Sequence, residues 1–134
     1  MAIIITSRGL NSLFVAKIIS TNLNIPIKFI EDDPKIDQYD EFFFVVSNRG
    51  DEELPECFEN FLNNLITLNK KYYICEIGNY FGFEYEFFGS RKIVDFILKR
   101  LGWQEVSSLS VDSMPAIDEE RLIDWIDQIK KDFL

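Results

Sequence analysis

The segment 78–83 (GNYFGF) contains the residue types that a ligand-binding loop needs. It follows an apolar, β-prone run at 72–77 and precedes a helix-like stretch at about 84–101. A loop between the carboxyl end of a strand and the next helix is where open α/β sheets bind ligands. Gly78 and Gly82 permit close approach of the backbone, and Phe83 offers a flat face for stacking on a planar ligand. The alternative interpretation is an aromatic turn that covers the core.

The first loop of this kind along the chain, Thr6 to Ser12, has the composition of a phosphate site at a helix N-terminus. Gly9 gives backbone freedom, Arg8 could add positive charge, and the loop supplies four polar donors besides: Thr6, Ser7, Asn11 and Ser12. Residues 1–30 contain no Asp or Glu, so a bound phosphate would meet no local repulsion. The alternative is an ordinary Ser/Asn helix cap.

The second loop along the chain runs from Ser47 to Pro55 and contains Asn48, Arg49 and Gly50. The guanidinium of Arg49 could stack on an aromatic ring of a ligand. The alternative is a polar turn whose acidic residues at 51–53 favour the start of a helix through the macrodipole.

Composition excludes several classes of protein. The 134 residues suffice for one domain, residues 1–134, and the hydrophobic fraction of 47% argues against disorder. The net charge of −9 argues against a nucleic-acid partner and favours a basic protein partner. No apolar stretch approaches the ~20 residues of a membrane span, so we expect a cytoplasmic protein without membrane contact.

The chemistry available to the side chains is also limited. Because the chain has no histidine, Ser-His-Asp and Cys-His catalysis are excluded, and the commonest metal ligand is missing. The two cysteines, Cys57 and Cys75, are too few for a zinc or iron–sulfur site, and both are expected to be reduced thiols of the core. Any chemistry is therefore expected to belong to a cofactor, with no catalytic residues and no metal.

Strand and helix patterns alternate along the chain, which predicts a parallel sheet between two helical layers. Gly102 is expected to end the third helix, and Asp118 to cap the fourth. Strands are predicted at 2–6, 27–30, 42–46, 72–77 and within 103–111, and helices at 13–23, 54–68, 84–101 and after 118. The predicted strand order is 2-1-3-4-5.

This pattern resembles the flavodoxin family over nearly the whole chain. The loop Gly78-Asn79-Tyr80-Phe81-Gly82-Phe83 is similar to the flavodoxin segment Gly-Asp-x-x-Gly-Tyr, with Phe83 in the place of the stacking Tyr. Thr6 and Gly9 match the phosphate signature Thr/Ser-x-Thr-Gly-x-Thr, whereas Arg8 and Asn11 replace two of its hydroxyl residues. A final strand, turn and Trp-bearing helix (109–126) also resemble the flavodoxin C-terminal pattern.

The resemblance implies a flavodoxin-like three-layer fold and a monomeric electron carrier, not an enzyme, that uses FMN and docks redox partners with a basic face. The implied cofactor-binding residues are Thr6, Ser7, Arg8, Gly9, Leu10, Asn11, Ser12, Ser47, Asn48, Arg49, Gly50, Gly78, Asn79, Tyr80 and Phe83. Two alternatives stay open. Gly78-Asn79 also resembles the Gly-Asn flavin loop of the flavodoxin-like activators of manganese ribonucleotide reductase, and the replaced hydroxyls suggest a flavin-free interaction module.

Overall fold

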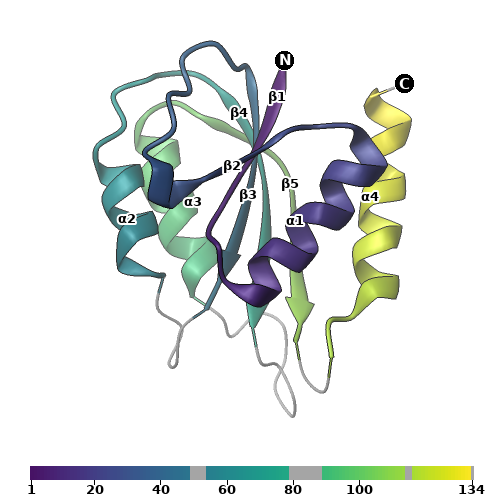
Figure 1. Ribbon diagram of the computed structural model, residues 1–134. Helices are drawn as coiled ribbons and strands as arrows, with labels where there is room; N and C mark the ends of the chain where they lie inside the picture. Colours follow the sequence, from purple (N-terminus) through teal and green to yellow (C-terminus); the bar gives the residue numbers. More distant parts are fainter. Residues whose placement is uncertain (49–53, 79–88, 114–115, 134) are drawn as a thin grey trace.

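The computed structural model describes residues 1–48, 54–78, 89–113 and 116–133. Five parallel strands form one sheet in the order β2-β1-β3-β4-β5, as predicted. Helices α2 and α3 cover one face of the sheet, and α1 and α4 cover the other (Figure 1). The elements are β1 (Ala2–Thr6), α1 (Leu10–Leu23), β2 (Ile27–Phe29), the short 3-10 helix η1 (Ile30–Asp32), β3 (Glu41–Ser47), α2 (Glu56–Asn63), β4 (Lys71–Gly78), α3 (Ser90–Arg100), β5 (Gln104–Asp112) and α4 (Glu119–Phe133).

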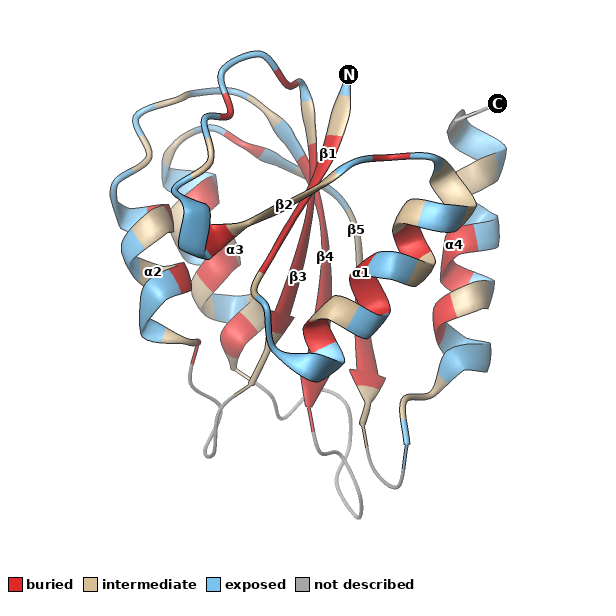
Figure 2. Cartoon of the chain, in the orientation of Figure 1, coloured by how far each residue is buried: buried red, intermediate tan, exposed pale blue. Residues whose placement is uncertain are grey.

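The central strand β3 shows why the sheet is covered on both faces. Phe42, Phe44 and Val46 pack into the core beneath α2 and α3, whereas Phe43 and Val45 pack into the core beneath α1 and α4. The strands are accordingly buried along the middle of the sheet (Figure 2). Burial of one such side chain contributes about 1.5–3 kcal/mol, so helices on both faces of the sheet stabilise a strand that is apolar at every position.

The predicted helices exist, but the bounds of three of them differ from the prediction. The first begins at Leu10 rather than residue 13, so Asn11 and Ser12 lie in its first turn. The second spans only Glu56–Asn63 of the predicted 54–68. The third, predicted at 84–101, is Ser90–Arg100, with Gly89 before its first residue; residues 84–88 lie outside the described residues. In addition, Ile30 leaves the second strand and begins η1.

Two predicted helix ends are confirmed in atomic detail. Gly102 follows α3 with a φ of +76°, the left-handed conformation that favours glycine after a helix. Asp118 accepts a hydrogen bond of 3.2 Å from the backbone N–H of Arg121 at the start of α4. Among the described residues, no helix is long and apolar enough to cross a membrane.

The prediction for one of the two cysteines is wrong. Cys75 is buried in β4, as expected, but Cys57 is exposed on α2. The buried side of α2 is formed by Phe58 and Leu62, which are four residues apart and therefore share one face. Cys57 lies about 100° around the helix from Phe58 and falls outside that face.

Candidate functional site

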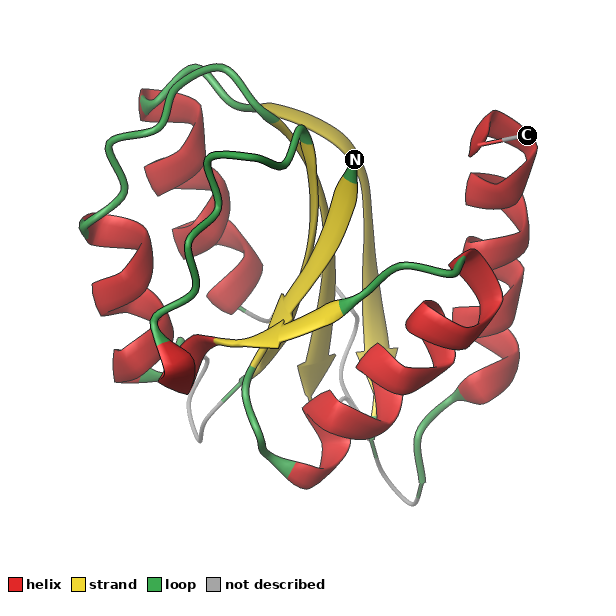
Figure 3. Ribbon diagram, turned by 45° about the horizontal axis from the view of Figure 1, so that its top comes forward, coloured by secondary structure: helices red, strands yellow, loops and turns green. Residues whose placement is uncertain are grey.

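The carboxyl ends of the parallel strands meet at one edge of the sheet, where the predicted loops follow β1, β3 and β4 (Figure 3). A hollow of about 380 Å³ opens at this edge. It brings together residues of the first and second predicted loops with Glu31 and with the start of α2. The lining residues are Ser7, Gly9, Leu10, Asn11, Ser12, Glu31, Ser47, Pro55 and Cys57.

Five predicted cofactor-binding residues lie outside the described residues: Arg49, Gly50, Asn79, Tyr80 and Phe83. The same holds for Phe81 and Gly82. The structure therefore describes the first loop in full, the beginning of the loop after β3, and Gly78 at the end of β4.

The N-terminus of α1 is available to an anion. Gly9 precedes the helix in an extended conformation, and no side chain at this position caps the helix with a hydrogen bond. The first turn contains no acidic residue. Because the first N–H groups of a helix have no partner within it, and because the helix dipole is positive at this end, a phosphate or carboxylate is favoured here. Leu10 and Asn11 of this turn are exposed.

The hydroxyl groups near this turn differ in their availability. Ser12 and Ser47 lie 2.6 Å apart, oxygen to oxygen, and so connect the first turn of α1 with the end of β3. Thr6 is fully buried and donates its hydroxyl proton to the carbonyl of Val45 at 3.1 Å. Ser7 lines the hollow beside Gly9. Thr6 thus holds β1 against β3, while Ser7, Ser12 and Ser47 place their hydroxyls at the hollow.

Arg8, a predicted cation for the phosphate, is bound elsewhere. Its guanidinium donates to both carboxylate oxygens of Asp32, at 2.6 and 3.1 Å, and its central carbon lies 4.3 Å from the centroid of the Phe29 ring. The hydrogen bond from Arg8 lowers the pKa of Asp32 below its usual value. This surface contact holds the guanidinium against β2 and η1.

Glu31 is a residue of this site that the sequence interpretation missed. Its carboxylate accepts the backbone N–H of Arg8 at 3.2 Å and lines the hollow. The absence of acidic residues from 1–30 therefore does not leave the first loop free of negative charge. The predicted strand order already indicated that Glu31 lies here. Thr6 pairs with Phe29, so the residues after Phe29 must lie beside the loop after Thr6.

Asn48 connects the ends of three elements. Its backbone N–H donates to the carbonyl of Ile77 at 2.8 Å, and its side-chain amide reaches the same oxygen at 3.4 Å. Its side-chain oxygen accepts the N–H of Ser90 at 3.2 Å. The carbonyl of Gly78 likewise accepts the backbone N–H of Ser113 at 2.9 Å. These contacts fix the positions of the backbone on either side of the segment 79–88.

Glu76 is a second residue of this region that the sequence interpretation missed. It is 1% exposed, and its Oε2 accepts the hydroxyl of Ser90 at 2.8 Å and the N–H of Arg91 at 2.7 Å. Its Oε1 accepts the hydroxyl of Ser110 at 3.2 Å. Gly89 gives α3 no side-chain cap, so a carboxylate from β4 takes that role. In the sequence, the one acidic residue within the apolar strand 72–77 indicated that Glu76 has a buried partner.

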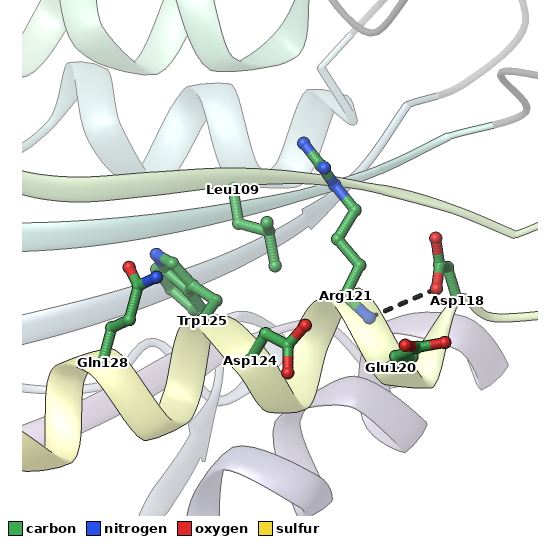
Figure 4. A pocket seen from close by; sticks show the side chains of 7 residues that line it. All are labelled: Leu109, Asp118, Glu120, Arg121, Asp124, Trp125 and Gln128. Atoms are coloured by element: carbon green, nitrogen blue, oxygen red, sulfur yellow. Dashed lines mark hydrogen bonds between the residues drawn. The ribbon is translucent and has the colours of Figure 1, made fainter.

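A larger hollow, of about 550 Å³, lies between α4 and the edge strand β5. Leu109 and Trp125 form its apolar part, and Asp118, Glu120 and Asp124 contribute carboxylates around it (Figure 4). None of the described residues of the predicted loops lines this hollow. Among the described residues, no group of three His, Cys, Asp or Glu side chains could hold a metal ion.

The fold and the position of the hollow define a flavodoxin-like α/β protein, and solved structures support this assignment. Flavodoxin 2 from Bacillus cereus is 20% identical, with a TM-score of 0.79, and the match covers 98% of this chain and 98% of that chain. Flavodoxin 1 from the same organism is 23% identical, with a TM-score of 0.76 and coverage of 97% and 96%.

A flavodoxin from Fusobacterium nucleatum, solved bound to flavin mononucleotide, is 18% identical, with a TM-score of 0.76 and coverage of 98% of this chain and 96% of that chain. No protein-family model matches the chain, and no curated protein matches it at a significant level. At these identities the structural similarities establish the flavodoxin-like fold.

Proposed function

We propose that the chain is a flavodoxin-like electron-transfer protein that binds FMN non-covalently at the carboxyl edge of its sheet. The observation that carries the proposal is the uncapped, acid-free first turn of α1 beside a hollow of about 380 Å³. A structural counterpart with the same fold, the Fusobacterium nucleatum flavodoxin, is bound to this cofactor.

The donors present fit the phosphate group of FMN. Ser7, Asn11, Ser12 and the free N–H groups of the first turn would bind the phosphate, and Thr6 and Ser47 would hold those residues in place. The predicted residues after Ser47 would surround the ring: Asn48, Arg49, Gly50, Gly78, Asn79, Tyr80 and Phe83. FMN supplies one-electron exchange when bound, and the chain supplies binding, orientation and the surrounding charge.

The charge of the chain suits the role of a carrier. A net charge of −9 attracts redox partners with a basic docking face and accelerates their encounter. The electron passes between proteins, so this role requires neither an enzymatic substrate nor catalytic side chains. We propose a cytoplasmic monomer that meets its partners transiently.

A flavin-free interaction module is the second candidate, and one contact favours it. The carboxylate of Glu31 already accepts the N–H of Arg8 in the loop that would receive the phosphate. The negative charge of this carboxylate would repel a phosphate dianion. The carboxylate also occupies an N–H group that could otherwise donate to the phosphate. The two candidates differ in a single property, which is the affinity for FMN.

Titration of the purified protein with FMN and with riboflavin, followed by flavin fluorescence, tests the proposal. We expect FMN to bind more tightly than riboflavin, because only FMN carries the phosphate. Absence of binding of either flavin would support the interaction module. Equal affinity for the two would show that the first loop is only a helix start.

A charge variant tests the phosphate site directly. Asn11→Asp adds a carboxylate to the first turn of α1, where the residue is exposed and an acid favours the helix. We expect it to weaken FMN binding severalfold and to leave riboflavin binding unchanged. Asn60→Asp, on the exposed side of α2, makes the same charge change away from the first loop and is the matched control.

A further inference from the structure

Helix α3 is basic in an acidic protein. It contains four basic residues and one acidic residue, whereas the chain has a net charge of −9. The acidic residue, Asp95, accepts a hydrogen bond of 2.7 Å from the hydroxyl of Tyr72 and is half-buried against the sheet. The outward side of the helix therefore presents cations without a carboxylate of its own.

The exposed residues of α3 share one side of the helix, and we call them the α3 basic face: Lys92, Phe96, Lys99 and Arg100. Phe96 follows Lys92 by four residues, and Lys99 and Arg100 follow Phe96 by three and four, so the four side chains lie on one side of the helix. Phe96 is 65% exposed, and the Arg100 guanidinium lies 5.6 Å from the centroid of its ring. Lys99 approaches the carboxylate of Glu105 at 4.0 Å.

A hollow of about 260 Å³ lies between α2 and α3 at the Arg100 end of this face. Its lining is aliphatic except for Asn63 and Arg100, and none of its lining residues is acidic: Leu62, Asn63, Leu65, Ile97, Arg100 and Leu101. Ile66 and Leu68, in the connection after α2, are 88% and 57% exposed. A hollow that combines aliphatic side chains with a cation at its rim suits an apolar side chain that has a carboxylate beside it.

We propose that the α3 basic face and this hollow bind an acidic protein segment in which carboxylates flank an apolar side chain. The apolar side chain would enter the hollow, and the carboxylates would meet Lys92 and Arg100. Charge complementarity selects this occupant, because the cations of the face are concentrated on one helix. An anionic membrane is disfavoured, since it would repel the acidic remainder of the chain over a broad area.

This surface is separate from the proposed flavin site. Helix α3 begins at the carboxyl edge with Ser90, and the hollow lies at its other end beside Arg100 and Leu101. Binding of an acidic segment at this surface is therefore independent of FMN binding. It gives the protein a second contact surface, with a charge preference opposite to that of its acidic remainder.

The test is a titration of isotope-labelled protein with two hexapeptides, followed by NMR. One peptide has a Leu-Phe pair flanked by glutamates, and the other has the same pair flanked by lysines. We expect only the acidic peptide to shift the amide signals of α3 and of residues 62–68, with an affinity on the order of millimolar. Raising the salt concentration should weaken this binding through screening.

Two variants and a control locate the binding. Lys92→Glu/Arg100→Glu should lower the affinity about tenfold, because both cations become repulsive. Phe96→Ser should lower it without any change of charge. Lys17→Glu/Lys35→Glu changes the net charge by the same amount at exposed positions on other elements and should leave most of the affinity intact.

Several results would overturn the inference. These are binding of both peptides alike, shifts outside α3 and 62–68, or no shift at millimolar peptide. A concentration-dependent dimer lost in Lys92→Glu/Arg100→Glu would instead assign the face to a second copy of the chain. Equal binding to vesicles containing anionic lipid would assign it to a membrane.

Discussion

The carboxylate of Glu76 accepts a hydrogen bond of 2.8 Å from the hydroxyl of Ser90, and these two residues stand on either side of the segment 79–88. The contact joins the end of β4 to the beginning of α3 through space. Asn48 adds a second connection, because it bonds to both Ile77 and Ser90. The ends of the loop that we assign to the flavin ring are therefore fixed by the buried side chains of Glu76 and Ser90 and by the partly buried Asn48.

Replacement of Glu76 by Ala should destabilise the fold by about 3 kcal/mol. The hydroxyls of Ser90 and Ser110 and the N–H of Arg91 would lose their acceptor, and each unsatisfied buried group costs about 1–3 kcal/mol. Urea unfolding measures the change. Glu76→Gln keeps one oxygen acceptor and should cost less, and Glu120→Ala, at an exposed position, should cost almost nothing. Equal stability of Glu76→Ala and wild type would contradict the role assigned to Glu76.

Replacement of Glu31 by Gln should tighten FMN binding severalfold. The change removes a negative charge that lies beside the backbone N–H of Arg8 in the proposed phosphate loop. Riboflavin, which lacks the phosphate, should bind as it does to the wild type. Glu119→Gln, at an exposed position on α4, changes the charge equally and is the control in the same fluorescence titrations. Unchanged FMN affinity in Glu31→Gln would show that this carboxylate does not meet the phosphate.

Phe83→Ala should weaken FMN binding severalfold and shift the reduction potential, with the fold intact. Phe83 lies outside the described residues, so the prediction depends on the spacing of Gly78, Gly82 and Phe83. Stacking of an aromatic side chain contributes roughly 0.5–1.5 kcal/mol beyond the burial of its area. Titration and potentiometry of Tyr80→Ala and Phe81→Ala are the comparisons. A loss confined to one of these two would move the stacking role to that residue.

Tyr73 should make the fold sensitive to alkaline pH. Burial, with smaller contributions from the charges of Glu41 and Asp132, raises the pKa of Tyr73 from 10.0 to about 12. The neutral phenol is thus favoured in the folded state, and its contribution to stability is complete below pH 10. This contribution disappears as the pH rises from 10 to about 12. Tyr73→Phe should lose less stability than wild type over this interval in urea unfolding. Parallel losses in the two proteins would refute the assignment.

Gly102→Ala should destabilise the protein by about 1–2 kcal/mol, because the residue has a φ of +76° and a side chain is strained there. An added Cβ would also clash with the side-chain oxygen of Asn69. Gly9→Ala is the matched control, since Gly9 has a φ of −60° and an added Cβ would make only ordinary contact with Ser7. Thermal unfolding of both variants makes the comparison, and a larger loss in Gly9→Ala would reverse the prediction.

The sheet was predictable because the apolar pattern of its strands is visible within each strand's own sequence. Strand β3 is apolar at consecutive positions, which is typical of a strand covered on both faces, and the alternation with helices then indicates a parallel sheet between two helical layers. The start of α1 was less predictable. A helix that begins after Gly9 without a capping side chain leaves no cap residue in the sequence to mark its first turn.

The site depended on contacts between residues far apart in the chain. Arg8 was predicted as a cation for the phosphate, but Asp32, 24 residues further along, binds its guanidinium. Glu31 reaches the first loop only because β2 pairs with β1. The sequence marks these residue types and the strand order, whereas their pairing follows from the register of the strands and the path of η1.

The exposed position of Cys57 gives the protein a natural attachment point for a spectroscopic label. The chain has two cysteines, and burial raises the pKa of the Cys75 thiol, which makes that residue inert. A maleimide dye should therefore react at Cys57 alone, without any engineered residue. Because Cys57 lines the hollow at the carboxyl edge, the dye would report directly on the arrival of any molecule there, whether or not that molecule absorbs light.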